Sequence, residues 1–405
     1  MDSAARVAER YTRSTQNRLP ERACGFESHP GYSQVSALDE IVALVDIGRR
    51  APGSDAERRA ARYLETRLRG LGRRAEVEPI QAWPNWPAAY ALCAALSLAG
   101  SLLSVSSPIA GTAAALAGAL LLFLDAGLLV PVARRLFGRR ASQNVVSVET
   151  RKRPGLVVLV AHYDAGRGGL ALGRRLCRGI GPRALWWAQL GVLACCVARV
   201  AGLDALALGV IQFVPTVALV VAVALLIDIA LAPTRGGEND NASGVALALR
   251  VAERLSPGRL EHFDVGLVFP GAQKAPAAGM RSFLKRHRTE LARESTVFIN
   301  VDEVGSGSVH VARKEGPLLG LRAPAQLIDL CEAPSYADHS AGDGYAARLR
   351  GYPTVTISCR GPDGRGEPSV EASAIESAEA FCAQLITRLD AELGPDLASS
   401  IRSTG

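Results

Sequence analysis

A small set of polar residues could carry chemistry, because each stands directly after an apolar, strand-like run or at the start of a helix. The set comprises His162, Asp240, Gln273, Lys274 and Asp302. In an open α/β sheet, ligands bind beyond the carboxyl ends of the strands, so these side chains are expected to converge on one crevice. An imidazole and two carboxylates form a donor set that suits zinc or manganese. The sequence therefore predicts a divalent-metal site with His162, Asp240 and Asp302 as its ligands.

The elements that must position these residues alternate between strands and helices. The patterns predict strands at Arg74–Pro79, Asn144–Glu149, Leu156–Ala161, Asp264–Pro270, Thr296–Val301 and Thr354–Cys359. They predict helices from the capping box Ser54–Glu57 to Arg69, and at Ala242–Leu255, Gly279–Leu291, Leu321–Cys331 and Ser373–Leu393. Strands rich in β-branched residues that alternate with helices are typical of an α/β fold with a doubly wound, mainly parallel sheet. This is the fold class that we predict.

The apolar residues are concentrated in two blocks. The 405-residue sequence is 48% apolar and 21% charged, and its mean hydropathy is +0.14. Four long apolar runs lie at 88–106, 109–133, 184–201 and 206–232. A helix needs about 20 residues to cross a hydrocarbon core. We therefore expect two transmembrane helical hairpins, 84–133 and 184–232, that interrupt the α/β domain.

The remaining boundaries follow from these two interruptions. The α/β domain is expected in three parts, 36–82, 141–180 and 236–395. A polar, irregular segment at 1–35 is expected to be disordered, and 396–405 to be a short tail. No stretch that resembles a signal peptide begins the sequence.

The placement of arginines predicts the orientation of the hairpins. The net charge is +7. The flanking arginines are Arg73, Arg74, Arg134, Arg135, Arg139, Arg140, Arg174, Arg175, Arg178, Arg183 and Arg235. The positive-inside rule then puts the inner turn of each hairpin outside and the α/β domain in the cytoplasm. Asp125 and Asp228 fall within the apolar runs, where acids are functional candidates by default. We expect the lipid bilayer as a partner and no nucleic acid, since basic and aromatic residues do not interleave in the polar sequence.

Several stretches occur in an order found in one peptidase family. They are A-H-Y-D at the end of Gly155–Asp164, N-D-N-A-S-G at Asn239–Gly244, a strand followed by G-A at Val268–Ala272, and F-I-N-V-D-E-V-G-S-G at Phe298–Gly307. With Arg49–Tyr63 and Gly351-Tyr352-Pro353, this order resembles the co-catalytic zinc exopeptidases, the aminopeptidase-like family 28 of the metallopeptidases. The resemblance covers nearly all of the sequence outside the hairpins and implies a zinc-exopeptidase type of sheet.

The resemblance also implies roles for single residues. In that family two zinc ions share a bridging aspartate, and His162, Asp240 and Asp302 match the ligands of the first ion, with Asp240 as the bridge. The family's adjacent glutamates, a general base and a ligand of the second ion, fall on Gln273 and Lys274. Gln273 therefore stands at the position of the general base.

The departures remove the base and the second metal site together. A glutamine cannot accept a proton near neutral pH, and a charged lysine cannot ligate a metal. No histidine follows His339, and Glu371 stands where the family has its late histidine ligand. We therefore predict a membrane-anchored pseudopeptidase in which the Lys274 ammonium forms an ion pair with Asp240 and Glu371, because carboxylates in a dry cleft need a compensating cation.

Alternatives from other classes remain open. One is an active mono-metal peptidase that keeps zinc at the first site and hydrolyses peptides or N-terminal residues. Its displaced base would be one of Asp164, Glu238, Glu303 and Glu371, although Asp164 more usually orients the histidine. Either the pair Asp338–His339 or Asp343 is expected to line the same cleft. A weaker alternative is a small transporter or scaffold that uses the four helices. At most one zinc ion, or none, is the expected cofactor.

Overall fold

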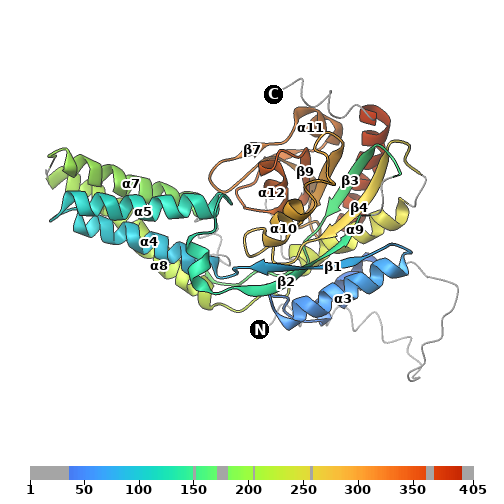
Figure 1. Cartoon of the computed structure of the whole chain (residues 1–405), viewed down its shortest axis with the longest axis horizontal. Helices are drawn as coiled ribbons and strands as arrows, with labels where there is room; N and C mark the ends of the chain where they lie inside the picture. Colours follow the sequence, from blue (N-terminus) through green and yellow to red (C-terminus); the bar gives the residue numbers. More distant parts are fainter. Residues whose placement is uncertain are drawn as a thin grey trace. The chain divides into compact units, whose positions relative to one another are not determined.

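The computed structural model describes residues 36–148, 152–170, 181–203, 206–255, 259–361 and 369–394. The predicted disordered segment 1–35, the tail 396–405, and the flanking arginines Arg174, Arg175 and Arg178 lie outside these ranges. The described residues form a large sheet with helices on its two faces, and a bundle of four further helices (Figure 1).

The sheet of the described residues has nine strands and is mixed. The strands are β1 (Glu76–Ala82), β2 (Arg140–Ser147), β3 (Gly155–Val160), β4 (Phe263–Phe269), β5 (Thr296–Val301), β6 (Ser308–Glu315), β7 (Leu321–Arg322), β8 (Ser335–Ala337) and β9 (Thr354–Arg360). Their order is β1-β2-β4-β3-β5-β9-β6-β7, and β8 pairs with β6. The central pairs β4–β3, β3–β5 and β5–β9 are parallel. The pairs β1–β2, β2–β4, β6–β9 and β6–β7 are antiparallel. The prediction of a mainly parallel sheet is therefore correct for its centre, and outside the centre only the short pair β6–β8 of the described strands is parallel.

The antiparallel pair β1–β2 has a simple cause. The chain leaves β1, runs through two antiparallel helices and returns into β2. Because a helical hairpin brings the chain back to the side from which it left, the flanking strands can be direct neighbours of opposite direction. The register runs from Glu76 opposite Val146 to Ala82 opposite Arg140.

Helices cover both faces of the sheet, as the doubly wound prediction requires. One face carries α2 (Ala37–Asp46), α3 (Asp55–Gly70), α9 (Ser243–Arg254), α11 (Ala325–Cys331) and α13 (Ala372–Arg388), and the other carries α10 (Ala278–Arg286) and α12 (Asp343–Leu349). Strand β3 shows the division: Val157 and Leu159 pack into the first core, and Val158 into the second. This alternation is the period-2 geometry of a strand buried on both faces.

Two predicted helices are shorter than expected. Helix α10 ends at Arg286 rather than at Leu291. The segment Leu321–Cys331 is a short strand, β7, followed by α11, which begins only at Ala325. Pro324 is the N-cap residue. Since proline has no backbone N–H to donate, it starts a helix more readily than it continues one. The strands β6 and β8 were not predicted from the sequence.

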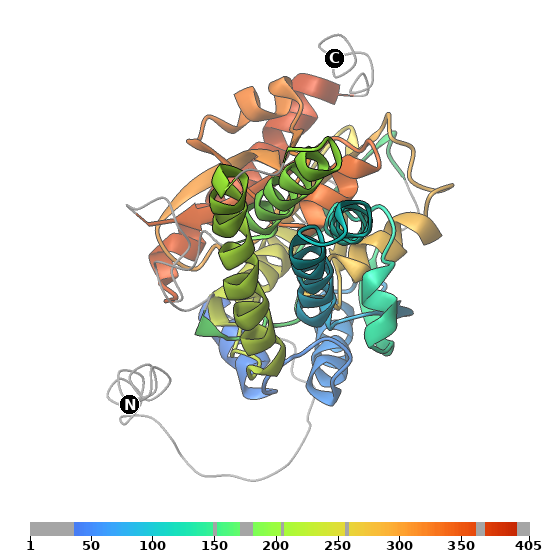
Figure 2. The ribbon, with the colours of Figure 1, turned by 90° about the vertical axis from the view of Figure 1, so that its left-hand side faces the viewer.

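The remaining long helices form a bundle, which faces the viewer in Figure 2. They are α4 (Trp86–Leu103), α5 (Pro108–Ala126), α7 (Pro182–Val200) and α8 (Leu206–Leu231). Helix α4 contacts the other three, and α7 contacts both α5 and α8. Helices α4, α5 and α8 are long and apolar enough to cross a membrane. Helix α7 contains Arg183, Gln189 and Arg199 and is not apolar enough to be a candidate span. The described residues therefore offer three candidate spans rather than the four that we predict.

Small residues let α4 and α5 approach closely. A Cβ on Gly111 would lie 2.4 Å from the Ser104 nitrogen, and one on Gly118 would lie 2.5 Å from the Cys93 carbonyl oxygen. Backbones brought together over small residues are typical of helix pairs in membranes.

Substitution Gly118→Leu is expected to destabilise the bundle by about 2–3 kcal/mol, because the added side chain must displace backbone of α4. Thermal unfolding of the full chain in detergent measures this loss. Gly209→Leu on α8 is the control, since the nearest atom to its Cβ position is 4.0 Å away. Equal losses in both variants would contradict the close-packing argument.

The two acids within the apolar runs have partners in the chain. Asp125 forms a buried ion pair with Arg134, whose backbone N–H donates to Asp125 Oδ2 at 3.1 Å. Asp228 Oδ2 accepts a hydrogen bond of 2.6 Å from the Leu170 N–H. Because these contacts hold the chain at helix ends, neither acid needs a catalytic or transport role to explain its presence.

The imidazole of His287 ties α10 to the edge strand β1. Its Nε2 lies 2.6 Å from Glu78 Oε1, and its Nδ1 lies 2.7 Å from Glu290 Oε2. The bond to Glu78 outweighs partial burial and raises the pKa of His287 to about 9. Since the unfolded value is about 6.5, the stabilisation is complete below pH 6.5 and is lost as the pH rises through 9.

We expect His287→Asn to lower the free energy of unfolding by about 1 kcal/mol at pH 6, a figure reduced for solvent screening. Above pH 9.5 the variant and the wild type should unfold at the same temperature. Thermal unfolding at both pH values measures the difference. A loss that does not change with pH would mean that the histidine contributes through packing alone.

Candidate metal centre

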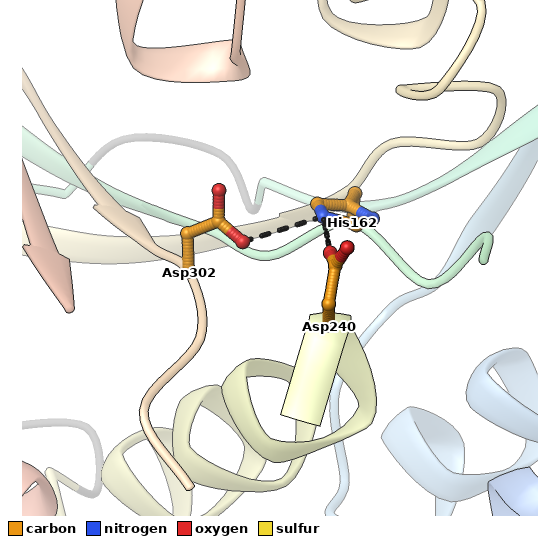
Figure 3. A group of neighbouring side chains, drawn as sticks. All are labelled: His162, Asp240 and Asp302. Atoms are coloured by element: carbon orange, nitrogen blue, oxygen red, sulfur yellow. Dashed lines mark ion pairs between the residues drawn. The ribbon is translucent and has the colours of Figure 1, made fainter. Parts of the chain in front are cut away.

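Three side chains from separate parts of the chain meet at the carboxyl end of the central strands. His162 Nε2 lies 3.3 Å from Asp240 Oδ1 and 3.4 Å from Asp302 Oδ1 (Figure 3). One ligand atom from each residue lies within 4.8 Å of the others. His162 follows β3, Asp302 follows β5, and Asp240 precedes α9. The structure thus brings together the three residues that the sequence analysis takes as metal ligands.

Asp164 contacts Nδ1 of His162, the ring nitrogen that does not face Asp240 and Asp302. It is fully buried, and its Oδ1 lies 3.2 Å from His162 Nδ1. The same carboxylate accepts backbone hydrogen bonds from Gln273 at 3.0 Å and Lys274 at 2.8 Å. Asp164 therefore orients the imidazole and fixes the loop after β4, which is a positioning role rather than that of a ligand.

The N-D-N-A-S-G motif locks the loop of Asp240 onto the loop after β5. Asn241 donates to the Val301 carbonyl at 2.8 Å and accepts from the Glu303 N–H at 3.1 Å. Asn239 accepts from the Gly305 N–H at 2.7 Å. A Cβ at Gly244 would lie 2.4 Å from Asn241 Oδ1, so only glycine fits there. Asp240 and Asp302, one in each loop, are held in register by these bonds.

Lys274 occupies the space beside the bridging position. Its Nζ lies 2.6 Å from Asp240 Oδ1, the same oxygen that faces His162. Burial alone would raise the pKa of Asp240, but the Lys274 ammonium and His162 outweigh it and hold that pKa well below its usual range. Burial alone would lower the pKa of Lys274, but Asp240 and Asp302 raise it. The expected ion pair between Lys274 and Asp240 is therefore present.

The other half of the expected ion pair is absent. Glu371 is exposed at the N-cap of α13, and its backbone N–H donates to the Gly305 carbonyl at 2.7 Å. No ion pair joins its side chain to Lys274 in the described part of the chain. The prediction that Glu371 compensates Lys274 is wrong, because the turn that starts α13 leaves this side chain in solvent.

Asp343 is buried near enough to His162 and Asp164 for their charges to act on its pKa, whereas Asp338 and His339 have partners elsewhere. Asp343 is 1% exposed, and neither carboxylate oxygen has a hydrogen-bond partner among the described residues. Burial raises the pKa of Asp343 to about 7, with His162 opposing that shift and Asp164 adding to it. The Asp338 carboxylate instead accepts hydrogen bonds from Ser340, and His339 is exposed and bonded to Arg183 at 3.0 Å.

The remaining candidate bases differ in their surroundings. Glu238 is exposed. Burial, and then the charges of Asp240 and Asp302, raise the pKa of Glu303 to about 7. Gln273 is only 7% exposed and its amide cannot accept a proton. No ionised carboxylate therefore stands at the position that the resemblance assigns to the base.

Sequence reasoning missed two buried charged residues behind the site. Arg50 is fully buried and donates to the carbonyls of Leu44, Tyr163 and Gly237 at 2.7–3.0 Å. Glu57, which reads as part of a capping box, accepts from the Ala272 N–H at 2.8 Å. Burial, and then Asp164, raise the pKa of Glu57 to about 8. Both residues hold the loops that carry the site.

The donor set fits one divalent cation. His162 Nε2 and Asp302 Oδ1 are buried atoms without a hydrogen-bond partner in the described ranges. An imidazole nitrogen and two carboxylate oxygens match the ligands of zinc. A second ion beside Asp240 does not fit, since the Lys274 ammonium lies there.

The fold of the described residues is that of the zinc-dependent exopeptidases, as comparison with solved structures shows. A Zn-dependent exopeptidase from Parabacteroides distasonis matches with a TM-score of 0.52 and 12% identity, over 88% of this chain and 99% of its own. A zinc aminopeptidase from Bacillus subtilis matches with a TM-score of 0.50 and 12% identity, over 89% and 96%. A glutaminyl cyclase from Tannerella forsythia matches with a TM-score of 0.50 and 14% identity, over 88% and 99%.

At these identities the matches show the fold and no more. The resemblance drawn from the motifs is confirmed at that level. No protein-family model and no curated protein matches the chain.

Proposed function

We propose that this chain is a membrane-anchored pseudopeptidase of the zinc-exopeptidase fold, which binds a peptide or a peptide-like ligand without hydrolysing it. The observation that carries the proposal is the 2.6 Å contact between Lys274 Nζ and Asp240 Oδ1. A fixed ammonium at this oxygen takes up the negative charge that a second metal ion would otherwise neutralise. Gln273 supports the same conclusion, because hydrolysis needs a group that removes a proton from water.

The first site is proposed to hold at most one zinc ion. His162, Asp240 and Asp302 would be its ligands, and the ion would supply a Lewis acid for a ligand's carbonyl or carboxylate oxygen. Asp164 would keep the histidine in the tautomer that ligates. Lys274 opposes the ion by repulsion and by occupying an Asp240 oxygen. The proposed site is thus weak for metal and incomplete for catalysis.

Membrane anchorage rests on the helical bundle. Helix α8 exposes large apolar side chains along its length, among them Leu206, Val210, Ile211, Phe213, Val214, Val220 and Leu231. An apolar surface of this extent suits lipid rather than water. The arginines that flank the bundle favour a cytoplasmic α/β domain, and a reporter fused after residue 394 would test that orientation.

A mono-metal peptidase is the second candidate. His162 Nε2 and Asp302 Oδ1, which have no hydrogen-bond partner among the described residues, favour a bound ion, and Asp343 offers a buried carboxyl group whose charge interacts with His162. In this candidate Asp343 would exchange the proton that Gln273 cannot accept.

One experiment separates the two candidates. The full-length protein is purified in detergent, and its zinc content and its turnover of aminoacyl substrates are measured beside His162→Ala. For a pseudopeptidase we expect at most one zinc per chain and no turnover above that of the variant. Turnover that His162→Ala abolishes would establish the peptidase, and two zinc ions in the wild type would overturn our interpretation of Lys274.

The substitution pair Gln273→Glu with Lys274→Glu provides the positive control. It restores the two carboxylates that the resemblance assigns to these positions. We expect this variant to bind more zinc than the wild type, because a cation is replaced by an anion beside Asp240. Unchanged zinc binding would mean that the ammonium does not control the site.

A further inference from the structure

The segment between α5 and β2 exposes apolar and cationic groups side by side. Its large exposed apolar side chains are Leu129 at 44%, Val130 at 42%, Val132 at 39% and Leu136 at 71%. Arg135 is exposed in the same segment, and its guanidinium lies 5.6 Å from the ring centroid of Trp83, just before α4. Apolar side chains beside arginine and tryptophan are typical of a segment at the membrane interface.

This segment is fixed against two helices of the α/β domain. Leu128 packs in one apolar cluster with Met280 of α10 and Tyr345 of α12. The Tyr345 hydroxyl donates to the Gly127 carbonyl at 3.4 Å. The end of α5, α10 and α12 therefore meet at one place.

Each of the three elements carries an arginine: Arg135 lies in the segment, Arg281 on α10 next to Met280, and Arg350 at the C-cap of α12. Arg281 on α10 is half-buried, and its guanidinium forms no hydrogen bond or ion pair with any described residue. Burial, and then the neighbouring charges of Arg134, Arg350 and Arg135, lower its pKa to about 10. Asp125, the acid nearby, is already paired with Arg134. A half-buried cation among like charges is unfavourable unless an anion accompanies it.

We propose that Arg135, Arg281 and Arg350 bind the headgroup of an anionic phospholipid. The phosphate oxygens would accept hydrogen bonds from the planar guanidinium groups. The apolar side chains of 129–136 would contact the first part of the acyl chains. Basic pockets beside membrane helices are suited to such headgroups. This inference rests on the membrane anchorage proposed above, and it adds a specific lipid site to it.

Native mass spectrometry of the full-length protein in detergent tests the site, with phosphatidylglycerol and phosphatidylcholine added in separate titrations. We expect the wild type to prefer phosphatidylglycerol at least fivefold. The double variant Arg281→Gln/Arg350→Gln should lose this preference. Arg62→Gln/Arg313→Gln, which removes two exposed arginines from α3 and β6, should keep it.

Three results would overturn the site. They are a preference that survives in the Arg281/Arg350 variant, an equal loss in the Arg62/Arg313 variant, and displacement of the lipid by millimolar inorganic phosphate. Thermal unfolding checks that the double variant is folded. If it is not, the single variant Arg350→Gln, at an exposed position, should still halve the preference.

Failure of the anchorage is recognised separately. Membranes that contain the full-length chain are washed with alkaline carbonate, which releases proteins that do not span the bilayer. A chain that is retained but shows no lipid preference overturns the headgroup site alone. A chain that is released overturns the anchorage itself.

Discussion

Lys274→Met is expected to raise the affinity of the candidate metal centre for zinc at least tenfold. The ammonium lies 2.6 Å from Asp240 Oδ1 and therefore competes with the ion for that oxygen while repelling it. Two unit charges about 4 Å apart interact by about 4 kcal/mol at an effective dielectric constant of about 20. Removal of part of this repulsion is sufficient to raise the affinity for zinc tenfold. Methionine keeps most of the length of the side chain and removes the charge and the N–H donors of the ammonium.

The same substitution is expected to destabilise the zinc-free protein by about 2–3 kcal/mol. Without the ammonium, Asp240 and Asp302 face each other across His162 with one cation fewer, and an uncompensated carboxylate in a partly buried site is unfavourable. Thermal unfolding in a chelator measures the loss, and added zinc should restore stability. The two effects have opposite signs, so a general packing defect cannot produce both.

Lys285→Met is the matched control. Lys285 is exposed on α10, eleven residues further along the chain, and makes no ion pair within the described residues. Its removal should change neither the zinc affinity nor the stability in chelator. If Lys274→Met binds zinc more weakly than the wild type, the ammonium supports metal binding and the pseudopeptidase proposal loses its main argument.

The ligand cluster could be predicted because its geometry follows from local sequence. His162 and Asp302 each stand one or two residues after a fully buried strand, and the parallel centre of the sheet brings the ends of these strands together. Asp240 stands three residues before α9, which packs against the same sheet. No tertiary detail was needed beyond the rule that parallel strands share a carboxyl edge.

Asp343 and Glu371 could not be placed in the same way. Whether an acid after a loop is buried depends on which elements pack over it. Asp343, the first residue of α12, is buried, whereas Glu371, the N-cap residue of α13, is exposed. The alignment of Glu371 with the family's late histidine gives its position in the sequence, but it does not show whether the side chain faces the site or the solvent. Burial, which decides the role of each acid, is a property of the assembled fold.

The edges of the sheet were less predictable than its centre. Strand β3 is buried on both faces and appears in the sequence as an uninterrupted apolar run. Strand β6 mixes exposed and buried positions without alternation, and its sequence contains His310, Arg313 and Lys314. It is a strand because it pairs with β9, which a local pattern cannot reveal.

Arg50→Ala is expected to lower the free energy of unfolding by about 3–5 kcal/mol, the largest effect of any single substitution considered. The guanidinium is fully buried and donates to the carbonyls of three segments. The acceptors are Leu44 in α2, Tyr163 beside His162, and Gly237 in the loop of Asp240. The last two acceptors lie 113 and 187 residues away along the chain. The substitution removes the guanidinium that donates to all three carbonyls, so these buried acceptors are left unpaired and a cavity opens.

The loss should extend to the metal centre, because the backbones of Tyr163 and Gly237 carry the loops on which His162 and Asp240 stand. We expect thermal unfolding in detergent to shift downward by about 10 °C, and zinc affinity to fall about tenfold. Arg49→Ala is the control: this neighbour is exposed, and its loss should stay within about 0.5 kcal/mol. If Arg50→Ala unfolds at a lower temperature but binds zinc as the wild type does, Arg50 stabilises the fold without positioning the ligands.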